Sequence, residues 1–286
     1  MPKAPTHAEL TRFVSSFLPP KTNDVSLLYH VPRVVSYSFE TAPVDHVVLS
    51  VTPTTQIYDA IGESKKQRRA ACPKRAHSEE PPPPSTVCFL HRPYKLDRHR
   101  VRNDALVLAS HTSFDEHLTV GWNTALAERI GINVDDSICV EGYKGDHERK
   151  IGIIGQTCLI LGPLLDSIER EFGAIEHAQE GLSEEIRVVA IMNAFSADEV
   201  QRVVDMAHNQ RWVPSVEQLG RHVLYLTGQP RESGLAEAEK LGMTVVCVGH
   251  RVAEQWGIEY LGASIRAAFP TVQVKEIYED GLRLPN

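Results

Sequence analysis

Residues 244 to 257 read TVVCVGHRVAEQWG, and this stretch contains the transition that decides the fold. The apolar, β-branched run at its start is typical of a strand inside a sheet. A single glycine, Gly249, separates this run from His250, and Glu254 follows four residues later. That spacing places two side chains on one face if the chain turns helical there. The stretch therefore predicts a buried strand, with an imidazole and a carboxylate on one face if a helix follows it.

The same alternation of strands and helices extends along the chain. Short β-branched or aliphatic runs predict strands at residues 45–51, 86–90, 105–110, 186–192, 222–227, 244–248 and 272–278. Helical spacing occurs at residues 116–131, 197–210, 234–242 and 259–269. Residues 137–156 instead predict a hairpin with a glycine-containing turn, so that part of the sheet is antiparallel. The sequence predicts an α/β protein with two lobes.

Composition restricts the classes of partner. The chain has 286 residues, of which 42% are apolar and 23% charged, so it can bury a large core. Its net charge of -7 argues against a general nucleic-acid or anionic-membrane binder, because both partners require a basic surface. The five cysteines are scattered without a Cys-x-x-Cys pair, which argues against a disulfide framework or a zinc ribbon. With no secretory h-region and no apolar stretch of membrane-spanning length, we expect a soluble protein in the cytoplasm.

One segment differs in composition from the rest. Residues 63–85 are first basic, then acidic, and then contain four consecutive prolines. Such a segment cannot bury enough apolar surface to offset its ordering entropy, so it predicts a disordered insert. Its basic part, Lys65 to Arg75, is compatible with a solvated loop, an anion-binding patch or a nuclear-import signal, and the last would add a nuclear location.

Polar residues stand directly after three of the predicted strands. These are His91; His111 with Asp115 four residues on; and His250 with Glu254 four residues on. In α/β sheets, ligands bind at the carboxyl ends of the strands. Imidazole and carboxylate groups together suit zinc, manganese, iron or cobalt. Alternatively, each histidine is an ordinary hydrogen-bonded residue, and the carboxylates interact with the positive ends of helices. Spacing alone leaves these alternatives open.

Longer motifs around these residues resemble a known family. The segments CFLHRPYKL, HTSFDEHLTVGWNTALAERIG and YLTGQPRESGLAEAEKLGMTVVCVGHRVAEQWGIEYLGASI are similar to the Nif-three-like family, named for NGG-one interacting factor three. Its bacterial members often carry the label GTP cyclohydrolase 1 type 2 homolog. The resemblance extends from about Asp45 to about Glu279 and implies a single family domain over residues 1–286. It also implies two α/β lobes with mixed sheets, a metal site between them, and a ring-like hexamer.

The resemblance assigns roles residue by residue. It implies that His91, Asp115, His250 and Glu254 are metal ligands, and that Glu254 can bridge two ions. His111 would lie at the site or directly behind the ligands. The implied cofactor is a divalent metal (zinc, manganese, iron or cobalt), one per chain, with a second position left open. Glu254 and His111 are the candidate catalytic residues, because either could handle a proton.

The chain departs from the family pattern at three places: the usual Asp-Asn-Val-Gly-Leu motif near the amino terminus is missing, and two further motifs are changed. Arg92 stands where a second histidine is usual, and TGQPRES, with Gln229 and Glu232, replaces a Thr-Gly-Glu motif. An arginine cannot be a metal ligand, because its guanidinium stays protonated. We therefore predict at most one tightly bound ion per chain, with Arg92 pairing with a site carboxylate or with the anionic part of a ligand. The alternative is that Arg92 turns outward to solvent.

The function that follows is a metal-dependent hydrolase of unknown substrate. A metal at such a site lowers the pKa of bound water and polarises a phosphoryl or acyl oxygen. The competing interpretation is a non-catalytic interaction or transcription-regulatory protein that retains the fold and part of the metal site. Arg92 favours this alternative, whereas retention of the four ligands favours the enzyme. A small-molecule substrate or a protein partner is expected, and nucleic acid is not.

Overall fold

The computed structural model describes residues 3–62, 85–214 and 219–279. The chain divides into two compact units. Among the described residues, the first contains those up to Phe114 and those from Ile258 to Glu279, and the second contains those of Asp115–Gly257. The disordered insert predicted at residues 63–85 lies, except for Ser85, outside the described residues. Each unit contains a β-sheet and helices, which confirms the predicted α/β fold class with two lobes.

The first unit is built on a five-stranded sheet with the strand order β1-β4-β3-β2-β11. The strands β2, β3, β4 and β11 are parallel, and the edge strand β1 runs antiparallel to β4. Every residue of β3 is buried, as expected for an inner strand. The bounds are β1 (Leu28–His30), β2 (His46–Ser50), β3 (Thr86–Leu90), β4 (Leu106–Ala109) and β11 (Gln273–Ile277). All except β1 were predicted.

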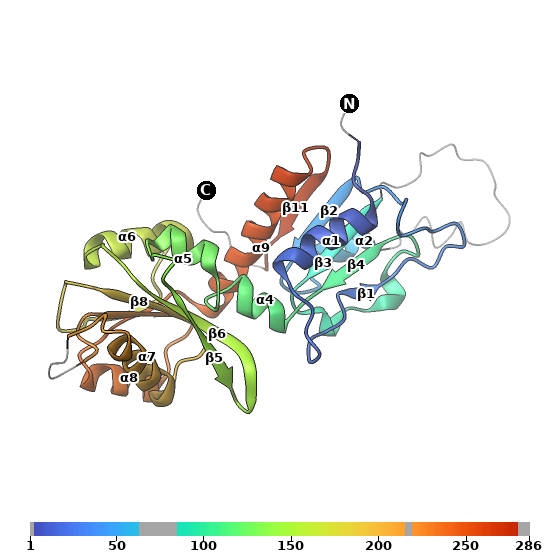
Figure 1. Ribbon diagram of the computed structural model, residues 1–286. Coiled ribbons are helices and arrows are strands. Elements are labelled where there is room, and N and C mark those ends of the chain that lie inside the picture. Colours follow the sequence, from blue (N-terminus) through green and yellow to red (C-terminus); the bar gives the residue numbers. More distant parts are fainter. Residues whose placement is uncertain (1–2, 63–84, 215–218, 280–286) are drawn as a thin grey trace. The chain divides into compact units, whose positions relative to one another are not determined.

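Helices cover both faces of this sheet (Figure 1). The helix α2 (Thr55–Ile61) buries Ile57 and Ile61 against alternate residues of the inner strands. On the other face, Gly262 of α9 (His250–Ala268) lies so close to Leu49 that an added Cβ would approach its side chain to 3.1 Å. The helix α1 (His7–Phe17) packs on α9, with the rings of Phe13 and Phe269 5.2 Å apart. Two short 3-10 helices, η1 (Pro93–Lys95) and η2 (Arg98–Arg100), follow β3.

The second unit is built on a six-stranded mixed sheet with the order β5-β6-β8-β9-β10-β7. The strands β8, β9 and β10 are parallel, whereas β5, β6 and β7 pair antiparallel with their neighbours. The turn of the predicted hairpin contains Lys144 and Gly145, both with positive φ, which confirms that prediction. The bounds are β5 (Ile138–Tyr143), β6 (Asp146–Gln156), β7 (His177–Gln179), β8 (Val188–Met192), β9 (Val223–Thr227) and β10 (Thr244–Cys247).

The helices of this unit lie on opposite faces of its sheet, α5 and α6 on one and α7 and α8 on the other (Figure 1). The buried face of α7 packs with alternate residues of the inner strands in one apolar core. The boundary between the units falls inside α4 and inside α9. The bounds are α4 (Thr112–His117), α5 (Thr124–Ile130), α6 (Leu161–Phe172), α7 (Ala197–Asn209) and α8 (Glu232–Lys240).

Two helix predictions need correction. A single helix over residues 116–131 is wrong, because α4 ends at His117 and α5 starts at Thr124. The chain turns tightly in between: a Cβ on Gly121 would lie 2.6 Å from the Glu116 carbonyl oxygen. The Asn123 side chain accepts from the Leu126 N–H at 3.0 Å and so caps α5. In contrast, the helix predicted from residue 259 begins nine residues earlier, at His250.

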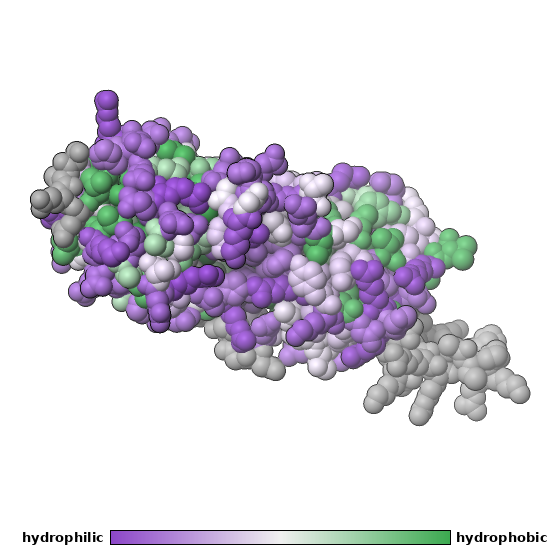
Figure 2. Space-filling model, turned by 90° about the horizontal axis from the view of Figure 1, so that it is seen from below, coloured by the Kyte–Doolittle hydropathy of each residue, from purple (hydrophilic) through white to green (hydrophobic). Residues whose placement is uncertain are grey.

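Hydrophilic residues cover much of the face shown in Figure 2, interrupted by apolar patches. Several large apolar side chains are exposed in the described part of the chain, among them Leu28, Val31, Val34 and Val35 in and after β1. No helix among the described residues has the length and apolar character needed to cross a membrane.

Candidate metal centre

His91 follows β3 directly, at the carboxyl end of the central sheet of the first unit. Its side chain is fully buried and stacks on the Phe114 ring, with the ring centroids 4.4 Å apart. The Nδ1 atom lies 3.1 Å from the Ser110 carbonyl oxygen. A carbonyl oxygen only accepts, so Nδ1 carries the proton and the lone pair of the imidazole is on Nε2. This arrangement, in which the other ring nitrogen is held by a carbonyl, is typical of a metal-binding histidine.

His111 lies at the corresponding end of β4, where the chain turns into α4. The carboxylate of Asp24 holds this turn from a distant loop. It accepts the backbone N–H groups of His111, Thr112 and Ser113 at 2.9 to 3.0 Å. Burial raises the pKa of the Asp24 carboxyl, but these hydrogen bonds outweigh burial and leave the pKa below its usual value. A charged Asp24 therefore fixes the backbone that presents His111.

Asp115 lies in α4, one turn after His111, and its side chain is 13% exposed. Its carboxylate Oδ2 is 3.7 Å from a guanidinium nitrogen of Arg149 on β6. Its backbone carbonyl accepts hydrogen bonds from the Thr119 hydroxyl at 2.6 Å and from the Asn193 amide at 3.1 Å. The two hydrogen bonds fix the backbone of the residue, and Arg149 is an ion-pair partner for its carboxylate.

His91, His111 and Asp115 form a group that could hold a metal ion. One ligand atom from each residue lies within 4.8 Å of the other two. The rings of His91 and His111 are 4.8 Å apart between centroids. Two imidazoles and one carboxylate form a donor set that suits zinc and other divalent transition metals. The residues present therefore fit the cofactor that the sequence predicts.

His250 and Glu254 lie on the first two turns of α9. The His250 Nε2 atom is 3.3 Å from a Glu254 carboxylate oxygen, which confirms that the spacing places them on one face. The Glu254 side chain is 4% exposed and that of His250 38%. Gly249 makes the sharp turn from β10 possible, because its φ of 92° is in the left-handed region. A Cβ there would also lie 2.6 Å from the Glu176 carboxylate.

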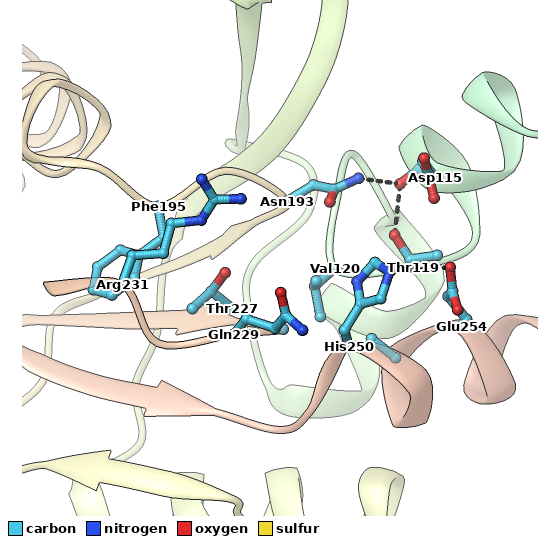
Figure 3. Close-up of a pocket in the computed structure, with 12 residues that line it drawn as sticks. Asp115, Thr119, Val120, Asn193, Phe195, Thr227, Gln229, Arg231, His250 and Glu254 are labelled. Carbon is cyan, nitrogen blue, oxygen red and sulfur yellow. Dashed lines mark hydrogen bonds and ion pairs between the residues drawn. The ribbon is translucent and has the colours of Figure 1, made fainter. Parts of the chain in front are cut away.

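The second unit contains a pocket of about 130 Å³ that is lined by His250, Glu254 and other polar residues (Figure 3). Asp115, His250 and Glu254 line it together with Asn193, Thr227, Gln229 and Arg231. Of the ligands predicted from the sequence, the structure thus brings Asp115 together with His91 in one group, and with His250 and Glu254 in one pocket. That all four share one ion stays a prediction.

Arg92, the main departure from the family pattern, is half-buried. Its backbone N–H donates to the Val51 carbonyl oxygen at 2.7 Å, which continues the pairing of β3 with β2 past His91. The prediction is that Arg92 pairs with a site carboxylate; the ion pair of Asp115 described above is with Arg149. The role predicted for Arg92 beside a site carboxylate stays a prediction.

Sequence reasoning missed three residues that support the site. Asp24 lies more than eighty residues before the backbone that it holds, and no local pattern marks it. Arg149 lies in the charged part of a hairpin strand, where a solvated cation is the ordinary expectation. Asn193 follows β8 directly, so the same position that marked the three histidines, after a buried strand, could have identified it.

Comparison with solved structures finds the same fold at low sequence identity. A Staphylococcus aureus protein, SA1388, is 13% identical, with a TM-score of 0.57 and coverage of 97% of this chain and 98% of that one. Reduced HcgD from Methanocaldococcus jannaschii is 15% identical, with a TM-score of 0.56 and coverage of 95% and 97%. A Bacillus cereus protein related to NIF3 is 14% identical, with a TM-score of 0.54 and coverage of 99% of each chain. At this identity the likeness shows the fold alone.

No curated protein matches the chain. The sequence profile of one family, described as Duf34/NIF3 (NGG1p interacting factor 3), matches residues 91–280, more than half of the chain. This range contains His91, His111, Asp115, His250 and Glu254, and it confirms the resemblance found in the sequence. The chain belongs to the Duf34/NIF3 family.

Proposed function

We propose that the chain is a metal-dependent hydrolase whose divalent ion is held by His91, His111 and Asp115. The observation that carries the proposal is the group of two imidazoles and one carboxylate with ligand atoms within 4.8 Å of one another. The hydrogen bond from His91 Nδ1 to the Ser110 carbonyl supports it, because metal-binding histidines commonly donate their other ring N–H to a carbonyl in this way. The nearby pocket supplies room for a substrate beside Asp115.

A divalent ion bound there would supply a water of lowered pKa and polarise a phosphoryl or acyl oxygen. The residues of the chain orient the ligands and handle protons. Glu254 is the buried carboxylate, and with His250 3.3 Å away the pair can hold a proton between Nε2 and Oε1. The ligand set predicted from the sequence, His91, Asp115, His250 and Glu254, is the alternative, in which His250 and Glu254 would bind the ion instead of sharing a proton. His111, for which the sequence suggested a catalytic role, is proposed as a ligand because of its place in the group.

Metal analysis and an activity assay test this proposal together. We expect the purified protein to contain about one equivalent of a divalent transition metal, and Asp115→Asn or His91→Ala to lose most of it. His99→Ala, which removes an exposed histidine of η2, is the matched control and should keep the metal. Hydrolysis of p-nitrophenyl phosphate or p-nitrophenyl acetate should disappear on chelation and return with zinc or manganese. Metal content unchanged in both site variants would refute the metal site.

A second candidate function is that of a non-catalytic interaction protein with the same fold and the same group of metal ligands. The observation that favours it is the exposed apolar run of Val31, Val34 and Val35 next to the edge strand β1. We propose that another copy of this chain covers this run in a homo-oligomer, for which the family resemblance suggests a hexamer. Light scattering of the wild type and of a Val34→Ser, Val35→Ser variant tests this. A wild type that is monomeric at micromolar concentration would contradict it.

A further inference from the structure

The segment from Thr227 to Arg231 places three polar side chains on the pocket of the second unit. Within the described part of the chain, the side chains of Thr227, Gln229 and Arg231 have no hydrogen bond or ion pair. We infer that this segment is an oxyanion subsite, which binds the carboxylate or phosphate group of a small substrate. The inference rests on the proposed function, because the reacting end of that substrate is the part on which the proposed hydrolase acts.

The fold holds this segment in place. Thr227 is the last residue of β9, and its carbonyl accepts the Val248 N–H at 3.0 Å, which ties the end of β9 to the end of β10. Gly228 lies against His250, with 3.4 Å between an added Cβ and the His250 Cα atom. Arg231 is the N-cap residue of α8, and its side chain is exposed. The backbone is thus fixed, with Thr227 buried and with Gln229 and Arg231 exposed at the pocket, where an incoming anion can reach them.

The charged groups of the pocket lie at opposite ends (Figure 3). Arg231 is at one end, Asp115 and Glu254 are at the other, and Thr227 and Gln229 lie between. The two carboxylates repel an anion. They attract a cation, or the electron-poor carbon of a carbonyl group or phosphorus of a phosphoryl group. Arg149 partly balances Asp115 from 3.7 Å away. A substrate with one anionic end can therefore enter in only one orientation.

The donors suit an oxyanion in number and kind. A guanidinium presents its N–H groups in a planar fork that matches a carboxylate or a phosphate, and the Gln229 amide and Thr227 hydroxyl each add a donor. The cavity of about 130 Å³ has room for a few water-sized groups, at roughly 30 Å³ each. This limits the buried part of the substrate to the oxyanion and a few further atoms. The subsite thus recognises a small acid or a small phosphoester.

Binding of the bare anions tests the inference without any assay of hydrolysis. Inorganic phosphate and acetate would be titrated in separate arms into the full-length protein at constant ionic strength, before and after removal of metal by chelation. We expect saturable binding of at least one anion in both states. The anion that binds more tightly identifies the substrate as a phosphoester or a carboxylic acid. Failure of both anions to bind would overturn the inference and would leave the metal-content test of the hydrolase unaffected.

Variants separate the subsite from general attraction to positive charge. Arg231→Gln should weaken binding about tenfold or more, because it removes a charge-assisted bidentate contact. Gln229→Glu should weaken it at least as much, since it places a carboxylate beside the anion. Thr227→Val, which keeps the side-chain shape on β9, should weaken it severalfold. Arg170→Gln, at an exposed position of α6, removes the same charge elsewhere in the unit and should have no effect. Equal binding by Arg231→Gln and the wild type would overturn the proposal.

Discussion

Replacement of Asp24 by alanine should destabilise the protein and weaken its metal site together. The carboxylate accepts three backbone N–H groups at the start of α4 at 2.9 to 3.0 Å, and the Ser110 hydroxyl at 3.0 Å. Hydrogen bonds to a charged group contribute about 1.5 to 3 kcal/mol each. Because Asp24 is half-buried and water can replace part of these bonds, we expect Asp24→Ala to lower the free energy of unfolding by about 3 to 5 kcal/mol.

The same backbone presents His111 and Asp115, so metal affinity should fall about 10- to 100-fold, as for other residues that orient ligands. Asp24→Asn keeps one acceptor oxygen and should lie between the wild type and Asp24→Ala in both measurements. Urea unfolding at neutral pH gives the stability, and competition with a zinc chelator gives the affinity. Asp104→Ala, which breaks the partly exposed pair of Asp104 with Arg102, is the control and should cost less than about 1 kcal/mol. An Asp24→Ala variant as stable as this control would refute the reasoning.

Three further predictions concern single positions. Arg92→His should raise the metal content from about one to about two equivalents, since it replaces a fixed cation by an imidazole ligand, and two equivalents in the wild type would refute this. Burial lowers the pKa of His7 to about 4, so only the unfolded state gains a proton at this residue as the pH falls below about 6.5. Stability should therefore decrease by up to about 3 kcal/mol between pH 6.5 and 4, and His7→Gln should lack this part of the decrease in urea unfolding measured at each pH. Gly249→Ala should cost about 1 to 3 kcal/mol in thermal or urea unfolding, because alanine is strained at a φ of 92° and its Cβ would crowd Glu176; a variant as stable as the wild type would contradict this.

Local signals in the sequence were sufficient for most regular elements. The inner strands were predicted because a strand buried on both faces is almost entirely apolar, as β8 is throughout and β3 is after Thr86. The hairpin was predicted because its turn requires residues that tolerate positive φ. The break between α4 and α5 was missed, because Asn123 and Gly121 act through close contacts that helical periodicity does not record.

The sequence by itself determined the family, the fold class and the candidate ligands, since each depends on residue type and on spacing along the chain. His250 and Glu254 share a helix face because four residues make about one turn. Only the tertiary structure decided which candidates meet. His91 and His111 are neighbours because β3 and β4 are paired, and Asp24 and Arg149 reach α4 and Asp115 through contacts between segments distant in the chain. Spacing along the chain does not determine such contacts, because they depend on strand pairing and on the packing of loops against the sheet.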